Sequence, residues 1–179
     1  MVNPGKTNSS VIFTDALRDR VKSVGRQLAR RKMSLSVCES CTAGMLGAVF
    51  TITPGSSRYF LGGIVAYADR IKQNIVGVQR ATLRIHGAVS AETCREMADR
   101  VRRRFRTDLG VAITGIAGPR GGSREKPAGL VYVTVTGAGR TETARCRFTG
   151  DRHEVRVKSC WAALELVNIF LSRGGHKER

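Results

Sequence analysis

The sequence predicts a single three-layer α/β/α domain built on a mixed sheet. Segments with apolar residues at helical spacing alternate with short apolar runs, as in proteins whose helices cover both faces of a sheet. Two strand-like segments are separated only by the glycine-rich stretch 137–140, which favours an antiparallel hairpin within that sheet. The 179 residues can bury a sizeable core but are too few for a TIM barrel.

The first part of the chain is expected to place a tight turn between a strand and a helix. Residues 14–31 form an amphipathic pattern that predicts a helix, with Thr14 or Asp15 as its N-cap. The elements expected next are a strand over 34–39, a short helix over 42–51, a loop over 54–57, and a strand over 59–67 interrupted by two glycines.

The second part alternates helix and strand again. A short helical piece contains Lys72, and a longer helix begins after Ser90 as its cap and runs through Phe105. The apolar run 109–113 is typical of a buried central strand. The remaining elements are strands over 130–135 and 143–148 and a closing helix over 151–172.

The two ends are expected to lie outside the domain, which spans 14–172. Residues 1–13 lack the apolar core of a signal peptide and are predicted to be a flexible leader, and 173–179 a frayed basic tail. No apolar run reaches the ~18–20 residues that a bilayer span needs. We therefore expect a cytoplasmic protein without a membrane partner.

The charge is strongly positive, with 31 Lys+Arg against 14 Asp+Glu and a net of +17. Such a balance favours anionic partners without specifying one. Many cations end predicted helices, at 30–32 and 100–106, where solvated faces and the helix dipole favour them. We interpret most of the excess as surface charge, and non-specific electrostatic binding of nucleic acid stays open as an alternative.

Two cysteines flank the predicted turn, in the order Cys38-Glu39-Ser40-Cys41. A C-x-x-C pair before a helix can be a redox site, but the odd count of five cysteines at irregular spacing argues against a disulfide framework. No second ligand pair accompanies them, and the three histidines are scattered. We interpret both cysteines as packing residues and expect no metal.

The same turn contains two hydroxyl residues, Ser40 and Thr42, which are helix caps in most proteins. A serine nucleophile needs a base, and Lys72 with Tyr67 could supply one. A lysine among apolar neighbours can lose its proton, and a tyrosine can relay one. Taken alone, Lys72 is an ordinary solvated helix lysine.

Two further segments could bind an anion. The loop 114–122 offers a run of backbone N–H groups, but it matches neither the Walker nor the dinucleotide pattern. Arg152 and Arg156 lie in the first turns of the predicted last helix, where their guanidinium groups could bind a phosphate. The alternative is that Asp151 caps this helix and both arginines are solvated.

Taken together and in order, these motifs form a specific series. They are ESCTAG at 39–44, PGSS at 54–57, Tyr67 with Lys72, HGAVS at 86–90, TGIAGP at 114–119, KPAGLV at 126–131 and GDR at 150–152. The series closely resembles the C-terminal domain family of the competence/damage-inducible protein CinA, over about residues 15–172. Many members of this family are nicotinamide-mononucleotide deamidases.

The resemblance implies an α/β/α amidohydrolase that needs no cofactor or metal and converts nicotinamide mononucleotide to nicotinate mononucleotide and ammonia. It places the nucleophile on Ser40, its partners on Tyr67 and Lys72, and phosphate binding on Arg152 or Arg156. It further implies a homo-oligomer, with a dimer favoured. Substrate-binding positions fall on Thr42, Gly44, Thr114, Gly115 and Gly118.

One position departs from the family pattern. Ala43 stands where many family members have a second glycine. Alanine is a mild change there if its φ is negative.

Overall fold

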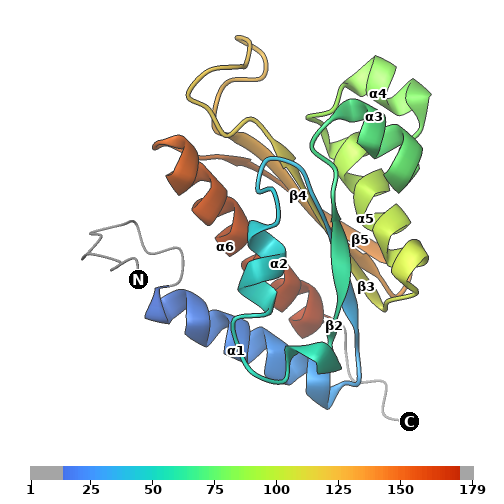
Figure 1. Ribbon diagram of the computed structural model, residues 1–179, viewed down its shortest axis with the longest axis vertical. Helices are drawn as coiled ribbons and strands as arrows, with labels where there is room; N and C mark the ends of the chain where they lie inside the picture. The colour runs from blue at the N-terminus through green and yellow to red at the C-terminus, as the bar shows by residue number, and fades with distance from the viewer. Residues whose placement is uncertain (1–13, 174–179) are drawn as a thin grey trace, which may run out of the picture.

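The computed structural model describes residues 14–173 and confirms an α/β domain with a mixed sheet between two layers of helices (Figure 1). The predicted leader at 1–13 and residues 174–179 of the predicted tail lie outside the described residues. The sheet has five strands in the order β2-β1-β3-β4-β5. They are β1 (Leu35–Glu39), β2 (Phe60–Val65), β3 (Leu109–Gly115), β4 (Leu130–Gly137) and β5 (Arg140–Arg147).

The sheet combines a parallel half and an antiparallel half. β1 pairs in parallel with both β2 and β3, while β3–β4 and β4–β5 pair antiparallel, so the predicted hairpin is confirmed. β5 begins at Arg140, three residues before the predicted start at 143, because Gly137 pairs directly with Arg140. Ala138 and Gly139 between them have φ of 49° and 73°, as a tight two-residue hairpin turn requires.

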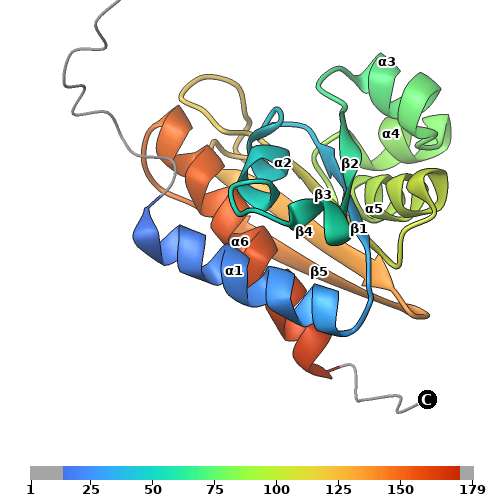
Figure 2. The ribbon, with the colours of Figure 1, turned by 60° about the horizontal axis from the view of Figure 1, so that its bottom comes forward.

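Three helices cover one face of the sheet: α1 (Asp15–Arg30), α2 (Met45–Phe50) and α6 (Arg152–Arg173). Figure 2 shows α1 and α6 packed side by side on that face. Thr14 is the N-cap of α1, since its Oγ1 accepts a hydrogen bond from the N–H of Leu17 at 3.2 Å. Over residues 14–173, no helix combines the length and the apolar character needed to cross a bilayer.

The other face is covered by α5 (Ala91–Phe105), with Ser90 as its predicted cap, and by shorter pieces at one end. These pieces are α3 (Asp69–Ile71), the π-helical turn η2 (Lys72–Val76) and α4 (Arg80–His86), while the 3-10 turn η1 (Ser56–Arg58) precedes β2. The sequence did not predict α4, because none of its residues is buried and it therefore has no apolar stripe to recognise.

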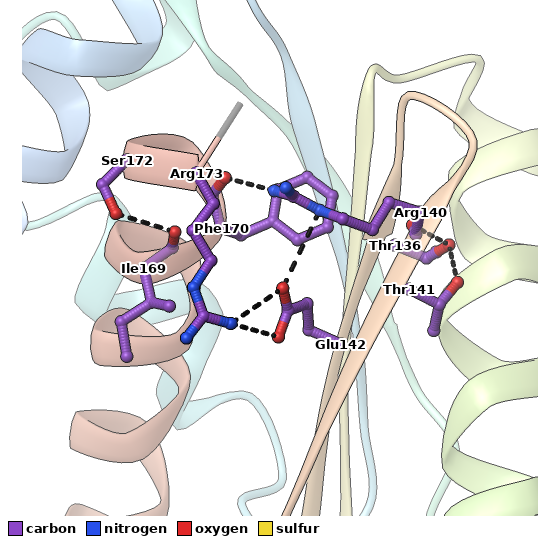
Figure 3. Close-up of polar contacts among 8 residues, drawn as sticks. All are labelled: Thr136, Arg140, Thr141, Glu142, Ile169, Phe170, Ser172 and Arg173. Carbon is purple, nitrogen blue, oxygen red and sulfur yellow. Dashed lines mark hydrogen bonds and ion pairs between the residues drawn. The ribbon is translucent and has the colours of Figure 1, made fainter. Parts of the chain in front are cut away.

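Arginine side chains hold the end of α6 in place through hydrogen bonds (Figure 3). The guanidinium of Arg140 stacks 4.0 Å from the ring centroid of Phe170 and donates a hydrogen bond to the carbonyl of that residue. Glu142 accepts two bonds from Arg173, each 3.2 Å long, and Arg31 donates to the carbonyl of Leu171 at 2.7 Å. Cations at helical carbonyls are favoured by the helix dipole. Part of the arginine excess therefore stabilises the fold.

Candidate active site

A pocket of about 250 Å³ opens at the carboxyl ends of the three parallel strands. Ligands of open α/β sheets commonly bind at such an edge. The chain leaves β1 at Ser40, β2 just before Tyr67 and β3 at Gly115, and all three residues line the pocket. The other predicted site residues in its wall are Lys72, Thr114, Gly118 and Arg152.

Three predicted site residues are not part of the pocket wall: Thr42, Gly44 and Arg156. They shape the turn that follows Ser40. Gly44 has a φ of 90°, which favours glycine, and Arg156 donates from Nη2 to the carbonyl of Thr42 at 2.8 Å. The Thr42 side chain is fully buried.

Ser40 itself is fixed at the end of the sheet. Its N–H donates to the carbonyl of Ile113 on β3 at 2.9 Å, and only 7% of the residue is exposed. Within the described part of the chain, its hydroxyl has no hydrogen bond to Lys72 or Tyr67. Ser40 and Lys72 therefore line the same pocket without a direct hydrogen bond between their side chains.

The first N–H groups of α2 are already occupied. The carboxylate of Glu39 accepts from the N–H groups of Gly44 at 3.1 Å, Leu46 at 3.0 Å and Gly47 at 2.8 Å. Glu39 is 1% exposed, and sequence reasoning did not select it. An anion bound in the pocket cannot use these three donors, because each already has an acceptor.

The other amides of the turn differ in whether they have an acceptor. Those of Ala43 and Met45 donate to the carbonyls of Ser40 and Thr42. Among residues 14–173, no oxygen accepts from the N–H groups of Cys41 and Thr42. Cys41 lines the pocket next to Ser40, so these are the backbone donors closest in sequence to its hydroxyl.

Ala43 has a φ of 49°, so the condition under which alanine would be a mild change is not met. A left-handed conformation costs an L-residue about 1–2 kcal/mol, whereas glycine adopts it freely. We expect Ala43→Gly to raise the free energy of unfolding by about 0.5–1 kcal/mol, after allowing for the greater freedom of glycine in the unfolded chain. Urea titration of both proteins measures this difference, and a destabilised variant would contradict it.

Lys72 is 1% exposed, so it is not a solvated helix lysine. Its Nζ donates to the backbone carbonyl of Tyr67 at 3.2 Å and lies 3.4 Å from Oδ1 of Asp69, which also lines the pocket. An ammonium has three donors, and these contacts use two of them. Lys72 therefore keeps a third donor direction beside the pocket.

The Tyr67 hydroxyl contacts a different residue. It accepts a hydrogen bond from Nη2 of Arg152 at 2.7 Å, and Nη1 of Arg152 donates to the carbonyl of Gly118 at 3.0 Å. These bonds hold the Arg152 guanidinium at the pocket wall, while Arg156 is bound to the turn instead. Sequence reasoning also missed Arg120, a pocket residue that its place in the glycine-rich loop could have indicated.

The C-x-x-C thiols are unsuited to redox chemistry. Burial raises the pKa of Cys38 to about 12 and that of Cys41 to about 11, so both stay protonated at neutral pH. All five cysteines are free. In the described range there is also no group of three His, Cys, Asp or Glu side chains that could hold a metal ion.

The Cys38 thiol gives the protein an expected pH dependence. The folded protein retains the Cys38 thiol proton up to about pH 12, whereas a thiol has an ordinary pKa of 9.0. The raised pKa therefore contributes a stabilisation of the folded state that is complete below pH 9.0 and is lost as the pH rises towards 12. We expect the unfolding free energy of the wild type to fall more steeply in this range than that of Cys38→Ala, by up to ~1.4 kcal/mol per pH unit. Urea titrations at several pH values measure the free energy of unfolding of both proteins. Equal dependence on pH in the wild type and in Cys38→Ala would contradict this expectation.

Comparisons with known proteins agree with this fold and identify a family. The family model described as CinA C-terminal domain matches residues 17–171. A CinA-like protein of Gemmatimonas aurantiaca is 46% identical over 147 residues, covering 82% of this chain and 34% of that protein. A CinA-like protein of Thermotoga maritima is 44% identical over 148 residues, covering 83% of this chain and 36% of that protein.

The fold also matches solved structures. The competence/damage inducible protein CihA from Agrobacterium tumefaciens superimposes with a TM-score of 0.86 at 34% identity, covering 90% of this chain and 98% of that chain. The curated relatives are longer, and this chain spans 34% to 40% of the first three. The matched residues 17–171 and these relatives together show that the chain belongs to the CinA C-terminal domain family.

Proposed function

We propose that this domain is an amidohydrolase that converts nicotinamide mononucleotide and water to nicotinate mononucleotide and ammonia. The observation that carries the proposal is the convergence of a buried serine, a buried lysine and an arginine on one pocket. A nucleophile, a base and an anion-binding group are the parts that hydrolysis of a phosphorylated amide requires.

In the proposed mechanism, the Ser40 hydroxyl attacks the carboxamide carbon. Lys72, which acts as the base in its neutral amine form, takes the hydroxyl proton either directly or through a water. The N–H groups of Cys41 and Thr42 stabilise the oxyanion of the tetrahedral intermediate, since Glu39 occupies the donors that follow them. The C–N bond breaks, ammonia leaves with the transferred proton, and water hydrolyses the acyl-enzyme to release the acid and regenerate Ser40.

The remaining wall of the pocket binds the rest of the substrate in this proposal. Thr114 is fully buried, and its hydroxyl donates to the carbonyl of Ala88 at 2.7 Å, which fixes the start of the glycine-rich loop. Tyr67 acts by orienting Arg152 rather than by relaying a proton. Arg152 and Arg120 supply the positive charge for the phosphate.

The direct test is ammonia release by the purified wild-type protein. We expect turnover of nicotinamide mononucleotide, with nicotinate mononucleotide formed in equal amount. Nicotinamide, asparagine and glutamine, assayed in parallel, distinguish this substrate from other amides. Turnover of one of these amides in its place would keep the serine chemistry but overturn the substrate, and no turnover of any amide would overturn the proposal.

Arg152 and Arg156 provide a matched pair for phosphate recognition. We expect Arg152→Ala to reduce the preference for nicotinamide mononucleotide over nicotinamide riboside by about 10–100-fold in kcat/KM, because only the first substrate has a phosphate. Arg156→Ala removes the same charge but should leave this ratio unchanged, since Arg156 binds the Thr42 carbonyl. Equal loss of the ratio in both variants would contradict the assignment.

A further inference from the structure

Arg156 directs its charge at the turn that follows Ser40. It lies on α6, which contacts α2 (Figure 1), and its Nη2 donates to the carbonyl of Thr42 at 2.8 Å. It is not part of the pocket wall. Among residues 14–173, no carboxylate lies within ion-pair distance of its guanidinium. The backbone of the turn is therefore the group that this cation contacts.

Packing alone does not require an arginine at this position. The Nε of Arg156 is buried and, in the part of the chain that the structure describes, has no hydrogen-bond partner. A buried donor without an acceptor destabilises a protein. An unbranched apolar side chain, such as that of methionine, could fill the same space without an unpaired donor.

The Thr42 carbonyl belongs to a chain of hydrogen bonds that ends at the pocket. The peptide group that contains this carbonyl also contains the N–H of Ala43, which donates to the carbonyl of Ser40 at 3.1 Å. The peptide group of the Ser40 carbonyl contains the N–H of Cys41, from which no oxygen in the described part of the chain accepts. A cation at one end of such a chain polarises every peptide group in it, so that each N–H becomes a stronger donor. The guanidinium therefore strengthens an amide that it does not contact.

The carboxylate of Glu39 opposes a negative charge at the same turn. Glu39 is 1% exposed and precedes Ser40 directly. A buried carboxylate disfavours a second negative charge nearby. Burial is the main cause of the raised pKa of the Cys41 thiol, and Glu39 raises this pKa further. The charges of Arg152 and Arg156 lower it, so Arg156 favours a negative charge at the position where Glu39 disfavours one.

We propose that Arg156 is a positioning residue for the amide hydrolysis, because through the Thr42 carbonyl it orders and polarises the turn whose amides stabilise the oxyanion formed at Ser40. This inference rests on the proposed function and deepens it, since it gives Arg152 and Arg156 separate roles. Arg152 binds the substrate phosphate. Arg156 acts when the oxyanion forms and therefore contributes to the transition state more than to substrate binding.

Steady-state kinetics of Arg156→Met on nicotinamide mononucleotide test the proposal. We expect kcat to fall by about 10-fold, less than the loss caused by removing a direct oxyanion donor. KM should change by less than ~2-fold, because the substrate contacts remain. Arg156→Lys should recover part of the lost kcat, since an ammonium can donate to the same carbonyl. A wild-type kcat in Arg156→Met, or a lysine variant no faster than the methionine variant, would overturn the proposal.

Amide proton shifts give a readout that does not require turnover. The N–H of Met45 donates to the Thr42 carbonyl at 3.2 Å and so shares this acceptor with Arg156. In Arg156→Met, the proton of Met45 should move downfield because its hydrogen bond strengthens. The proton of Ala43 should move upfield, because the peptide group that carries it is less polarised. A turn that had only loosened would move both protons upfield, and that result would contradict the proposal.

Lys158→Met is the matched control, because Lys158 lies on the same helix and donates to a backbone carbonyl outside the turn, that of Thr149. It should leave kcat and both amide shifts unchanged, and thermal unfolding shows that all variants remain folded. If the wild type hydrolyses nicotinamide mononucleotide and Arg156→Met is equally fast, this inference alone is wrong. If the wild type hydrolyses no amide, the proposed function is wrong. The opposite shifts would then still support polarisation of the turn by Arg156, and unchanged shifts would overturn it.

Discussion

Replacing Ser40 by alanine is expected to lower the turnover of nicotinamide mononucleotide by at least ~10³-fold, because no other hydroxyl can take the place of the attacking group. Two other hydroxyls lie in the pocket wall: Thr114 Oγ1 already donates to the carbonyl of Ala88, and the Tyr67 hydroxyl accepts from Arg152. The backbone of residue 40 keeps its bond to Ile113, since that bond uses the N–H alone. Ammonia release under saturating substrate measures the loss.

Ser36→Ala is the matched control for this experiment. Ser36 lies on the same strand, is fully buried, and contacts Thr107 through its hydroxyl at 2.8 Å, away from the pocket. Its loss should lower stability without lowering turnover by a comparable factor. If both variants retained wild-type turnover, Ser40 would not be the nucleophile and the proposed mechanism would be wrong.

Periodicity predicted the long elements because those elements bury a regular face. α1 has buried residues at Leu17, Val21, Val24 and Leu28, and the sequence shows this spacing directly. The β3 strand was found in the same way, since its apolar run is buried on both sides. The short helix α4 was not found, because none of its residues is buried. The short helical piece predicted around Lys72 corresponds to α3 and the π-helical turn η2.

The candidate site was only partly predictable for a related reason. The series of motifs named Ser40, Lys72 and Thr114 as neighbours, and the pocket brings them together. The choice between Arg152 and Arg156 depends on which way each side chain turns from one helix, and sequence spacing does not determine that. Glu39 was passed over because its role depends on how the turn folds back over the start of α2.

Glu39 is the second residue with a large expected effect. Its carboxylate is the acceptor for three N–H groups at the start of α2, and it lies next to Ser40 in the chain. A buried donor left without an acceptor costs about 1–3 kcal/mol. We therefore expect Glu39→Ala to lower the free energy of unfolding by about 3–5 kcal/mol, within the range of the most damaging single substitutions. Urea titration measures this loss.

Glu39→Gln separates stability from positioning. The amide oxygen can still accept from the start of α2, but the amide nitrogen cannot, so at least one of the donors of Gly44, Leu46 and Gly47 loses its acceptor. We expect an intermediate loss of stability. We also expect a lower kcat with little change in KM, because a shift of the turn moves Ser40 and the amides of Cys41 and Thr42, whereas Arg152 stays in place. Glu165→Ala, which breaks only a surface ion pair with Arg20, should change stability by less than about 1 kcal/mol. Wild-type stability in Glu39→Ala would show that the start of α2 does not depend on this carboxylate, and the turn would then need another support.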